Sequence, residues 1–168
     1  MINVIGIGGC SRSGKSVLAQ QIKDHLFNKR VLLLDMDDFV FPEENIPKIK
    51  DRTDWECPGS VDFNRLYSTI KNHQDSYDLI VVEGILAFAN KSLMLFYDST
   101  IWIQLSKETF LTRRKKETRW GDEPDWFITH VWDSYLHYGQ WPEADFILSG
   151  EKEISKTALN EIVRRVVN

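Results

Sequence analysis

The sequence predicts an α/β protein in which a parallel β-sheet is covered by helices on both faces. Strand-like segments alternate along the chain with segments of helical periodicity, and this alternation is typical of such sheets. The segment Leu79–Val82 is apolar throughout, as a central strand buried on both faces should be. A glycine-rich segment, Gly8–Ser16, follows an apolar run and precedes a helical pattern, which is the setting of a phosphate-binding loop. Ligands of such sheets bind beyond the carboxyl ends of the strands.

Five strands and five helices are expected from the hydrophobic pattern. Short apolar runs predict strands at Ile2–Ile7, Val31–Asp35, Leu79–Glu83, Thr100–Leu105 and Asp145–Leu148. Apolar residues three and four positions apart predict helices at Lys15–Phe27, Asp62–His73, Lys107–Arg119, Trp126–Tyr138 and Ser155–Val167. The polar segment Phe41–Pro58 holds three of the five prolines and shows no clear period. We interpret it as a long loop, a kind of segment that is often functional.

Size and composition limit the class of protein. The chain has 168 residues, and this length predicts one domain. Its formal net charge is −4 and it has no long basic stripe, so nucleic acid is a poor candidate partner. Cys10 and Cys57 fit neither a disulfide framework nor a metal-ligand spacing, so we expect free thiols in a reducing compartment. No apolar segment approaches the roughly 20 residues that span a bilayer. We expect a soluble cytoplasmic protein without a membrane partner, and its oligomeric state stays open.

The segment Gly9–Ser16 fits the pattern G-x-x-x-x-G-K-[ST] of phosphate-binding loops. Its glycines let successive backbone N–H groups turn toward a phosphate, Lys15 reaches the β- and γ-phosphates, and the Ser16 hydroxyl ligates Mg²⁺. A nucleoside triphosphate with Mg²⁺ is therefore the expected ligand, and the alternative is a glycine turn before an ordinary helix. The candidate nucleotide-binding residues are Gly9, Ser11, Ser13, Gly14, Lys15, Ser16 and Val17.

Acidic residues follow two of the predicted strands. Asp37 comes just after the second strand, where a carboxylate could accept the proton of a substrate hydroxyl while that hydroxyl attacks a phosphate. Asp35 lies within the strand, and Asp38 could cap the turn. The alternative is that all three are turn and surface acids.

Glu83 ends an apolar strand, where an acid is costly unless Mg²⁺ or its water is the partner. The alternative is that Glu83 has a purely structural role and bonds to the backbone or to Lys15.

Four consecutive cations, Arg113, Arg114, Lys115 and Lys116, lie near the end of the helix predicted after the fourth strand. Such a run is most often a solvated helix face. Because it follows a core strand and precedes Gly121–Pro124, it could instead close over the phosphates, excluding water and neutralising transition-state charge. Arginine suits this task because its planar fork binds phosphate oxygens in pairs. Arg113 and Arg114 are therefore candidate catalytic residues in a lid at about residues 107–124.

The long loop contains Trp55 and Glu56, an aromatic face beside a carboxylate. This pair could stack on a base and accept hydrogen bonds from ribose hydroxyls. Alternatively, Trp55 plugs the edge of the core beside an exposed Glu56. We expect His130, on a helix rich in tryptophan, to be packed and hydrogen-bonded and not catalytic. The four histidines show no spacing typical of zinc ligands, so protein-bound zinc is not expected.

Taken together, the motifs resemble the uridine kinase and nicotinamide riboside kinase group of small P-loop kinases. The segments that carry the resemblance span almost the whole chain: Gly9–Ser16, Asp37–Phe39, Trp55–Pro58, Val82–Phe88 and Arg113–Arg114. Residues 37–39 and 126–140 favour the nicotinamide riboside kinases. The segment 56–58, followed by Asp62, is similar to uridine kinases instead. In place of the family's usual Tyr or Phe followed by Asp, this chain has Trp55 followed by Glu56.

The resemblance implies a single nucleoside kinase domain over residues 1–168. The implied fold is the three-layer α/β/α sandwich of P-loop kinases, with a five-stranded parallel sheet in the order 2-3-1-4-5 and a helical lid. Asp37 is implied as the catalytic base, and the loop after the last strand, at Ser149–Gly150, would lie near the adenine. The residues implied in catalysis are Asp37, Lys15, Arg113 and Arg114, those implied at Mg²⁺ are Ser16 and Glu83, and those implied at the acceptor are Asp37, Trp55, Glu56 and Arg114.

The leading hypothesis is transfer of the γ-phosphoryl group of ATP to the 5′-hydroxyl of a ribonucleoside, with nicotinamide riboside slightly ahead of uridine or cytidine. The positive nicotinamide ring would suit the Trp-Glu pair. A kinase of another small alcohol, for instance a pantothenate- or shikimate-like one, is the second hypothesis. Such an anionic acceptor would need extra cations in the long loop, which offers only Lys48, Lys50 and Arg52 among five acids. A nucleotide-dependent switch is the third hypothesis, and residues 90–93 lack the last acid of a guanine-reading Asn-Lys-x-Asp.

Overall fold

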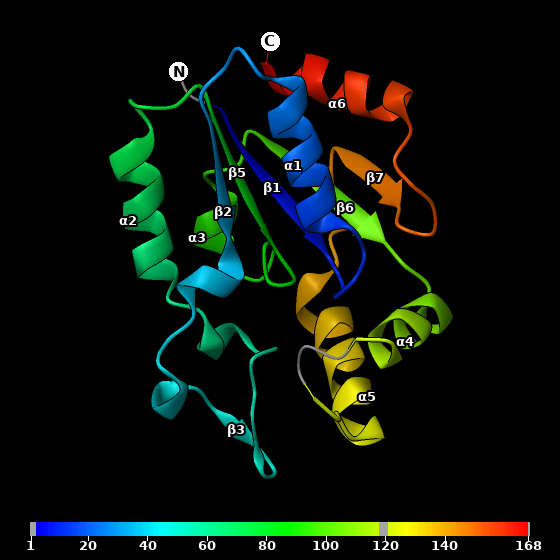
Figure 1. Cartoon of the computed structure of the whole chain (residues 1–168). Coiled ribbons are helices and arrows are strands. Elements are labelled where there is room, and N and C mark those ends of the chain that lie inside the picture. Colours follow the sequence, from blue (N-terminus) through cyan, green and yellow to red (C-terminus); the bar gives the residue numbers. More distant parts are fainter. Residues whose placement is uncertain (1–2, 118–120, 168) are drawn as a thin grey trace.

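The computed structural model describes residues 3–117 and 121–167 and contains a five-stranded sheet between two layers of helices (Figure 1). The strands of this sheet are β1 (Asn3–Gly9), β2 (Val31–Asp35), β5 (Leu79–Gly84), β6 (Ser99–Gln104) and β7 (Phe146–Ser149). All neighbouring strands are parallel, in the order β2-β5-β1-β6-β7. The predicted α/β class is confirmed, and every predicted strand ends within two residues of its expected place.

Two short strands lie outside this sheet. β3 (Lys48–Ile49) and β4 (Arg52–Thr53) form an antiparallel hairpin. Because these two strands are included in the numbering, the labels of the main sheet do not read 2-3-1-4-5 as expected. Counted within the main sheet alone, the order is the expected one. The predicted long loop at Phe41–Pro58 therefore contains a short hairpin that was not foreseen. Two-residue strands are too short to show a period in the sequence, and the hairpin closes through Lys50, whose φ is 52°.

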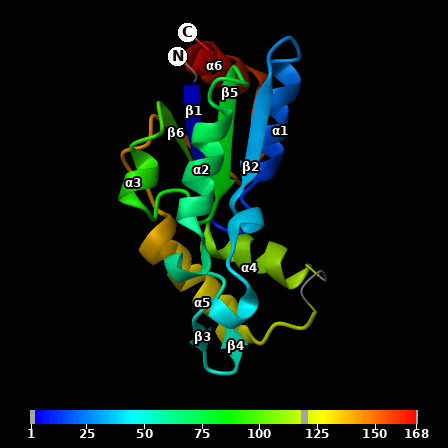
Figure 2. The same ribbon diagram turned by 90° about the vertical axis from the view of Figure 1, so that its left-hand side faces the viewer.

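Helices cover both faces of the sheet (Figure 2). One face carries α1 (Lys15–His25) and α6 (Lys156–Val167), and the other carries α2 (Phe63–His73), α3 (Lys91–Met94) and α5 (Asp125–Ser134). Successive strand residues alternate between the two cores, so Val81 packs in the core of α1 whereas Ile80 and Val82 pack in the core of α2. Every residue of β5 is buried, as its apolar sequence predicts.

Several helix boundaries differ from the prediction. α4 (Lys107–Lys115) begins after its cap Ser106, and its predicted end, Arg119, lies outside the described residues, as does Ile2 at the predicted start of the first strand. The helix expected to continue to Tyr138 becomes a π-helix, η4 (Tyr135–Gly139), after α5. The short α3 was not foreseen because one helical turn carries no periodicity. None of the described helices is long and apolar enough to cross a bilayer.

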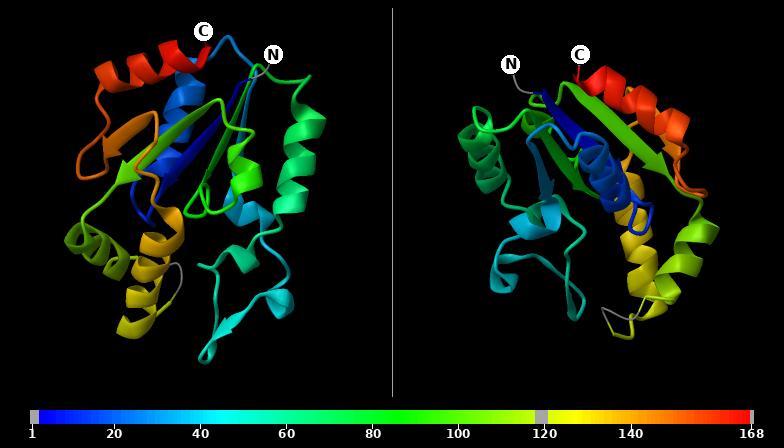
Figure 3. Two further views of the ribbon diagram at one scale, coloured as in Figure 1. Left: turned by 180° about the vertical axis from the view of Figure 1, so that it is seen from behind. Right: turned by 45° about the horizontal axis from the view of Figure 1, so that its top comes forward.

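The carboxyl ends of the strands meet at one edge of the sheet, and α4, α5 and the hairpin lie beyond that edge (Figure 3). The strand register sets Asp35 beside Glu83, and Glu83 beside Ile7. The residues that follow β1, β2 and β5 therefore reach the same edge, which brings the phosphate loop, Asp37 and Glu83 together.

Candidate active site

The phosphate loop connects β1 to α1 and folds back on itself. The Ser13 N–H donates to the Cys10 carbonyl at 3.2 Å, and the Lys15 ammonium donates to the same carbonyl at 3.0 Å. Gly14 has a φ of 100°, a left-handed conformation that other L-residues rarely adopt. Gly14 also offers no side chain to cap α1, so the first N–H groups of this helix remain available to an anion such as a phosphate.

The loop after β7 packs directly on the phosphate loop. A Cβ at Gly150 would come within 2.7 Å of the Ser13 carbonyl oxygen, so this approach requires glycine. The Ser13 hydroxyl is buried and has no hydrogen-bond partner within the described part of the chain. Because an unpaired buried hydroxyl is costly, a phosphate oxygen or a water bound in the loop would relieve it. The loop residues thus fit the phosphates of a nucleotide.

Glu83 ends β5 close to the base of the phosphate loop. Its side chain is buried, and this burial raises its pKa, against the opposing effects of the Lys15 ammonium and the Ser16 hydroxyl. Residues 3–117 and 121–167 contain no group of three or more His, Cys, Asp and Glu side chains that could hold a metal. A divalent ion would therefore depend on Ser16, Glu83 and the nucleotide phosphates. Few protein ligands together with phosphates are the arrangement that Mg²⁺ prefers.

Asp37 lies in a 3₁₀ turn, η1 (Met36–Phe39), directly after β2. The Asp37 N–H donates to Asp35 Oδ1 at 2.9 Å, and this bond caps the turn. The pKa of Asp37 is raised, first by the protein atoms that surround its carboxylate and then by the negative charge of Asp35, while Lys15 lowers it. The side chain nevertheless remains accessible to solvent. An accessible carboxylate with a raised pKa beside the phosphate loop is suited to accept a proton.

Arg114 is buried, with 7% of its surface exposed, and this excludes the solvated-face interpretation for its side chain. Its guanidinium donates two hydrogen bonds of 2.7 Å to the carboxylate of Glu123 and one of 2.9 Å to the hydroxyl of Ser11. Such a two-point pair fixes the guanidinium plane more strictly than a single bond would. Arg114 is therefore held in a defined orientation against the phosphate loop.

Two further contacts join α4 to the phosphate loop. Arg113 donates to the Arg12 carbonyl at 3.0 Å, and the Arg12 guanidinium lies 2.8 Å from the carboxylate of Glu117. Lys115, by contrast, pairs across 3.3 Å with the exposed Asp125. Arg113 thus faces the phosphate loop, whereas Lys115 lies on the solvated side of the helix.

Glu56 follows the hairpin and is buried, with 8% of its surface exposed. Burial raises its pKa to about 7; Arg114 opposes this shift, and Asp37 adds to it. The charges of Arg114 and Asp37 therefore act on Glu56, although the three residues come from different parts of the chain. Trp55 is 40% exposed. The alternative of a Trp55 that plugs the core beside an exposed Glu56 is thus wrong, because the burial of the two side chains is reversed.

His130 lies on α5 and is packed and hydrogen-bonded, as predicted. Its Nε2 lies 2.8 Å from Asp54 Oδ1 and 3.4 Å from the Ser134 hydroxyl, and the centroid of its ring is 6.0 Å from that of Phe127. The two cysteines, Cys10 and Cys57, are free thiols, as expected from their spacing.

Several known proteins are similar in sequence to this chain. No protein-family model matches the sequence. Nicotinamide riboside kinase 1 of Homo sapiens is 30% identical over 162 residues, which cover 82% of this chain and 76% of that protein. The chain belongs to the nicotinamide riboside kinase family. This membership makes it a kinase, an ATP-dependent phosphotransferase that requires a divalent metal as kinases in general do.

Two further matches support the wider relationship of this kinase. Uridine-cytidine kinase-like 1 of Mus musculus is 28% identical over 137 residues, which cover 66% of this chain and 25% of that protein. A solved structure described as a possible uridine kinase from Bacillus stearothermophilus is similar with a TM-score of 0.59, at 20% sequence identity and over 88% of each chain. The structural match shows the fold alone. The resemblance to the uridine kinase and nicotinamide riboside kinase group is confirmed.

Sequence patterns did not reveal two residues of the candidate site, Glu123 and Asp54. Glu123, which holds Arg114, stands in an acidic stretch after Gly121, and nothing in that pattern separates it from surface acids. Asp54, which contacts His130, directly precedes the predicted Trp-Glu pair. Its position beside that pair was the only signal that could have revealed it. Asp54 acts across 76 positions of sequence, which local patterns do not report, whereas Glu123 acts across only 9.

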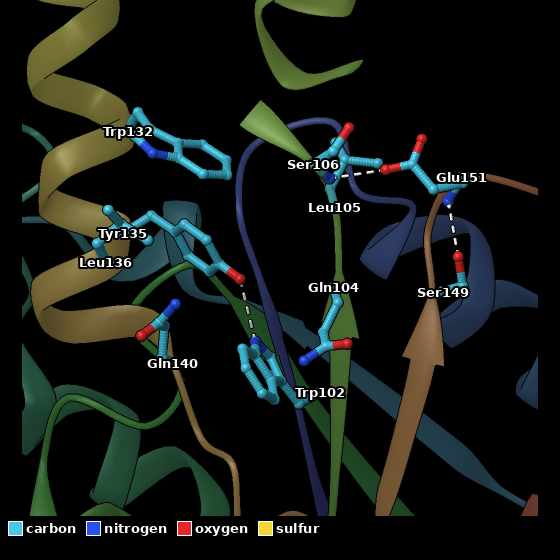
Figure 4. A pocket seen from close by; sticks show the side chains of 10 residues that line it. All are labelled: Trp102, Gln104, Leu105, Ser106, Trp132, Tyr135, Leu136, Gln140, Ser149 and Glu151. Carbon is cyan, nitrogen blue, oxygen red and sulfur yellow. Dashed lines mark hydrogen bonds between the residues drawn. The ribbon is translucent and has the colours of Figure 1, made fainter. Parts of the chain in front are cut away.

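A pocket of about 350 Å³ lies at the carboxyl ends of β6 and β7 of this kinase, on the face of the sheet that α5 covers (Figure 4). On one side Trp102 donates from Nε1 to the Tyr135 hydroxyl at 3.2 Å. On the other side Glu151 accepts from the Ser106 N–H at 2.7 Å and from the Thr109 hydroxyl at 2.6 Å, and these bonds lower its pKa. Asp37, Glu56 and Arg114 do not line this pocket.

Proposed function

We propose that this kinase transfers the γ-phosphoryl group of ATP, with Mg²⁺, to the 5′-hydroxyl of a ribonucleoside, and that nicotinamide riboside is preferred to uridine and cytidine. The observation that carries the proposal is the burial of Glu56 next to Arg114 and Asp37. A buried carboxylate beside an accessible acid and a phosphate loop is what a polar, hydroxyl-rich acceptor would require.

The roles proposed for the residues follow from their positions. Lys15 and the first N–H groups of α1 would hold the phosphates, and Ser16 with Glu83 would hold Mg²⁺, which neutralises phosphate charge when bound. Asp37 would accept the proton of the 5′-hydroxyl as its oxygen forms a bond to the γ-phosphorus and the bond from that phosphorus to the ADP oxygen breaks. The lid arginines, above all Arg114, would stabilise the charge that develops on the transferred group.

The charge of the acceptor end supports a cationic acceptor over an anionic one. Glu56 and Asp37 are both acids, and Arg114 is already paired with Glu123. A positive ring beside Glu56 would favour its charged form, whereas an anionic acceptor would be repelled by the two carboxylates. The loop cations Lys50 and Arg52 are engaged elsewhere, over the rings of α5. A pantothenate- or shikimate-like acceptor is disfavoured for this reason.

The test is a panel of acceptors with the full chain, ATP and Mg²⁺. ADP release is coupled to a colorimetric signal for nicotinamide riboside, uridine, cytidine, pantothenate and shikimate, and compared as ratios of kcat/KM. The expected result is turnover with the ribonucleosides and the highest ratio for nicotinamide riboside. Higher kcat/KM for uridine would refute the electrostatic argument, and ADP release that needs no acceptor would indicate a nucleotide-dependent switch.

A further inference from the structure

The hairpin that precedes Glu56 is joined to α5 by contacts that no motif predicted. We call this set of contacts the acceptor clamp. On the hairpin side it consists of Lys50, Arg52 and Asp54, and on the other side of Asp122, Trp126, Phe127 and His130. The two sides are separated by about seventy residues of sequence, since Arg52 and Asp122 differ by 70 positions.

Two cations of the clamp lie over aromatic rings. The Lys50 ammonium is 4.1 Å from the centroid of the Trp126 ring, and the Arg52 guanidinium carbon is 5.4 Å from that of Phe127. Arg52 also donates to the Asp122 carbonyl at 3.2 Å. These contacts attach the tip of the hairpin to the beginning of α5, and each is of modest strength because its cation is near solvent.

The Asp54 carboxylate is the point where the clamp reaches the acceptor end. Its Oδ1 accepts the backbone N–H of Glu56 at 3.2 Å and lies 2.8 Å from His130 Nε2. Because a carboxylate oxygen accepts, the proton of the second contact comes from Nε2. The side chains of Asp54 and His130 are 14% and 19% exposed, so the pair is largely protected from water. One oxygen atom thus connects α5 to the backbone of Glu56.

We propose that His130 is a positioning residue for the acceptor: through Asp54 it fixes the Glu56 backbone, and so sets the direction of the Glu56 carboxylate toward the nucleoside. This inference rests on the proposed function, because it gives Glu56 an acceptor to bind. His130 itself touches neither the phosphate loop nor Asp37 in any described contact. Its effect is therefore on acceptor binding and not on the chemical step or on ATP.

The kinetic test compares His130→Leu with His130→Gln. Leucine removes the donor, whereas the amide nitrogen of glutamine reaches about as far as Nε2 and can still donate to Asp54. His130→Leu should raise the KM for the acceptor about 10-fold, the effect of a lost bond to a charged group, with the KM for ATP and kcat changed less than about twofold. His130→Gln should recover most of the wild-type KM. The matched control is His137→Leu, the same change at an exposed histidine of η4.

A double-mutant cycle separates positioning from packing. If His130 acts through Asp54, His130→Leu should have no further effect on the acceptor KM in the Asp54→Ala background. A packing role would instead give additive losses, would raise the KM for ATP as well, and would leave His130→Gln no better than His130→Leu. Any of these three results overturns the inference.

Amide hydrogen exchange tests the same inference without turnover. In His130→Leu, peptides that contain Glu56 should exchange about 10-fold faster than in the wild type, while peptides of the phosphate loop and α1 should be unchanged. Unchanged exchange at Glu56 overturns the inference whichever acceptor the enzyme uses. If no ribonucleoside is phosphorylated but exchange at Glu56 rises as expected, the proposed function fails and the positioning of Glu56 by His130 stands. His130→Gln should restore slow exchange, which also excludes a general loss of folding.

Discussion

The proposed phosphate half and the proposed acceptor half of this kinase are built in opposite ways. The phosphate half is a continuous segment, from β1 through Gly14 to the start of α1, and the groups proposed to bind phosphate are largely backbone N–H groups. The acceptor half is assembled from the turn after β2, the segment after the hairpin that contains Glu56, and α4 with Glu123. The groups proposed to bind the acceptor are charged side chains that meet only in the fold.

The two halves should therefore respond differently to substitution. The phosphate half depends on backbone conformation at a few glycines and on the side chains of Lys15 and Ser16, so changes at these positions should impair ATP binding. The acceptor half depends on the balance between Glu56, Asp37 and Arg114, because Arg114 and Asp37 both affect the pKa of Glu56 and Arg114 also affects that of Asp37. Substitutions in the acceptor half should therefore alter acceptor kinetics while they leave ATP binding intact.

The largest effect is expected from Asp37→Asn. Removal of the proposed general base should lower kcat by roughly 10² or more, because the 5′-hydroxyl proton then lacks an acceptor. ATP binding, measured by calorimetry, and thermal unfolding should be close to those of the wild type. Asp38→Asn is the matched control, since this neighbouring acid is exposed and is expected to be dispensable. Near-normal turnover of Asp37→Asn would remove Asp37 from the role of base.

The next largest effect is expected from Arg114→Lys. Lysine keeps the charge but cannot make the two-point contact with Glu123 and the bond to Ser11 at the same time. We expect kcat/KM to fall between about 10- and 100-fold, the range for loss of charge-assisted hydrogen bonds. Lys115→Met, on the solvated side of α4, should change it less than about twofold. Equal effects of the two substitutions would show that the lid acts only through its net charge.

A smaller effect is expected from Glu56→Gln, and it sharpens the contrast between the halves. The KM for a cationic nucleoside should rise about 10-fold, that for uridine should rise less, and the KM for ATP should be unchanged. Initial rates at saturating ATP with each nucleoside varied measure the first two, and rates at saturating nucleoside with ATP varied measure the third. Glu44→Gln, at an exposed glutamate of the same loop, is the control. A parallel rise in the KM for ATP would mean that Glu56 belongs to the phosphate half.

The smallest effect is a pH dependence of stability. The pKa of Glu56 is raised from 4.5 to about 7 in the folded chain. Between these values the folded state binds more protons than the unfolded state, so this residue makes the free energy of unfolding fall as pH rises from 4.5 to 7. We expect a loss of about 1–3 kcal/mol in the wild type relative to Glu56→Gln, measured by urea unfolding at pH 5 and pH 8. Parallel pH profiles of the two proteins would contradict the burial of an ionisable Glu56.

The two halves also differ in how much of each could be predicted from the sequence. The five sheet strands and the phosphate loop were predicted because a buried parallel strand and a glycine-rich turn leave local patterns. The hairpin at Lys48–Thr53 and the single-turn α3 were missed because segments of two to four residues show no period. Asp54 was missed because it acts on a residue 76 positions away, and Glu123 because a stretch of acids does not show which of them pairs with Arg114.

The α/β class, the phosphate loop at Gly9–Ser16 and the acids Asp37 and Glu83 near the ends of β2 and β5 could be predicted without a structure, because hydrophobic period and glycine position are local properties of the chain. The burial of Glu56, the pairing of Arg114 with Glu123 and the contact of α5 with the residue after the hairpin are seen in the folded chain alone. Burial and charge pairing depend on which segments meet in space, and no local pattern records those meetings.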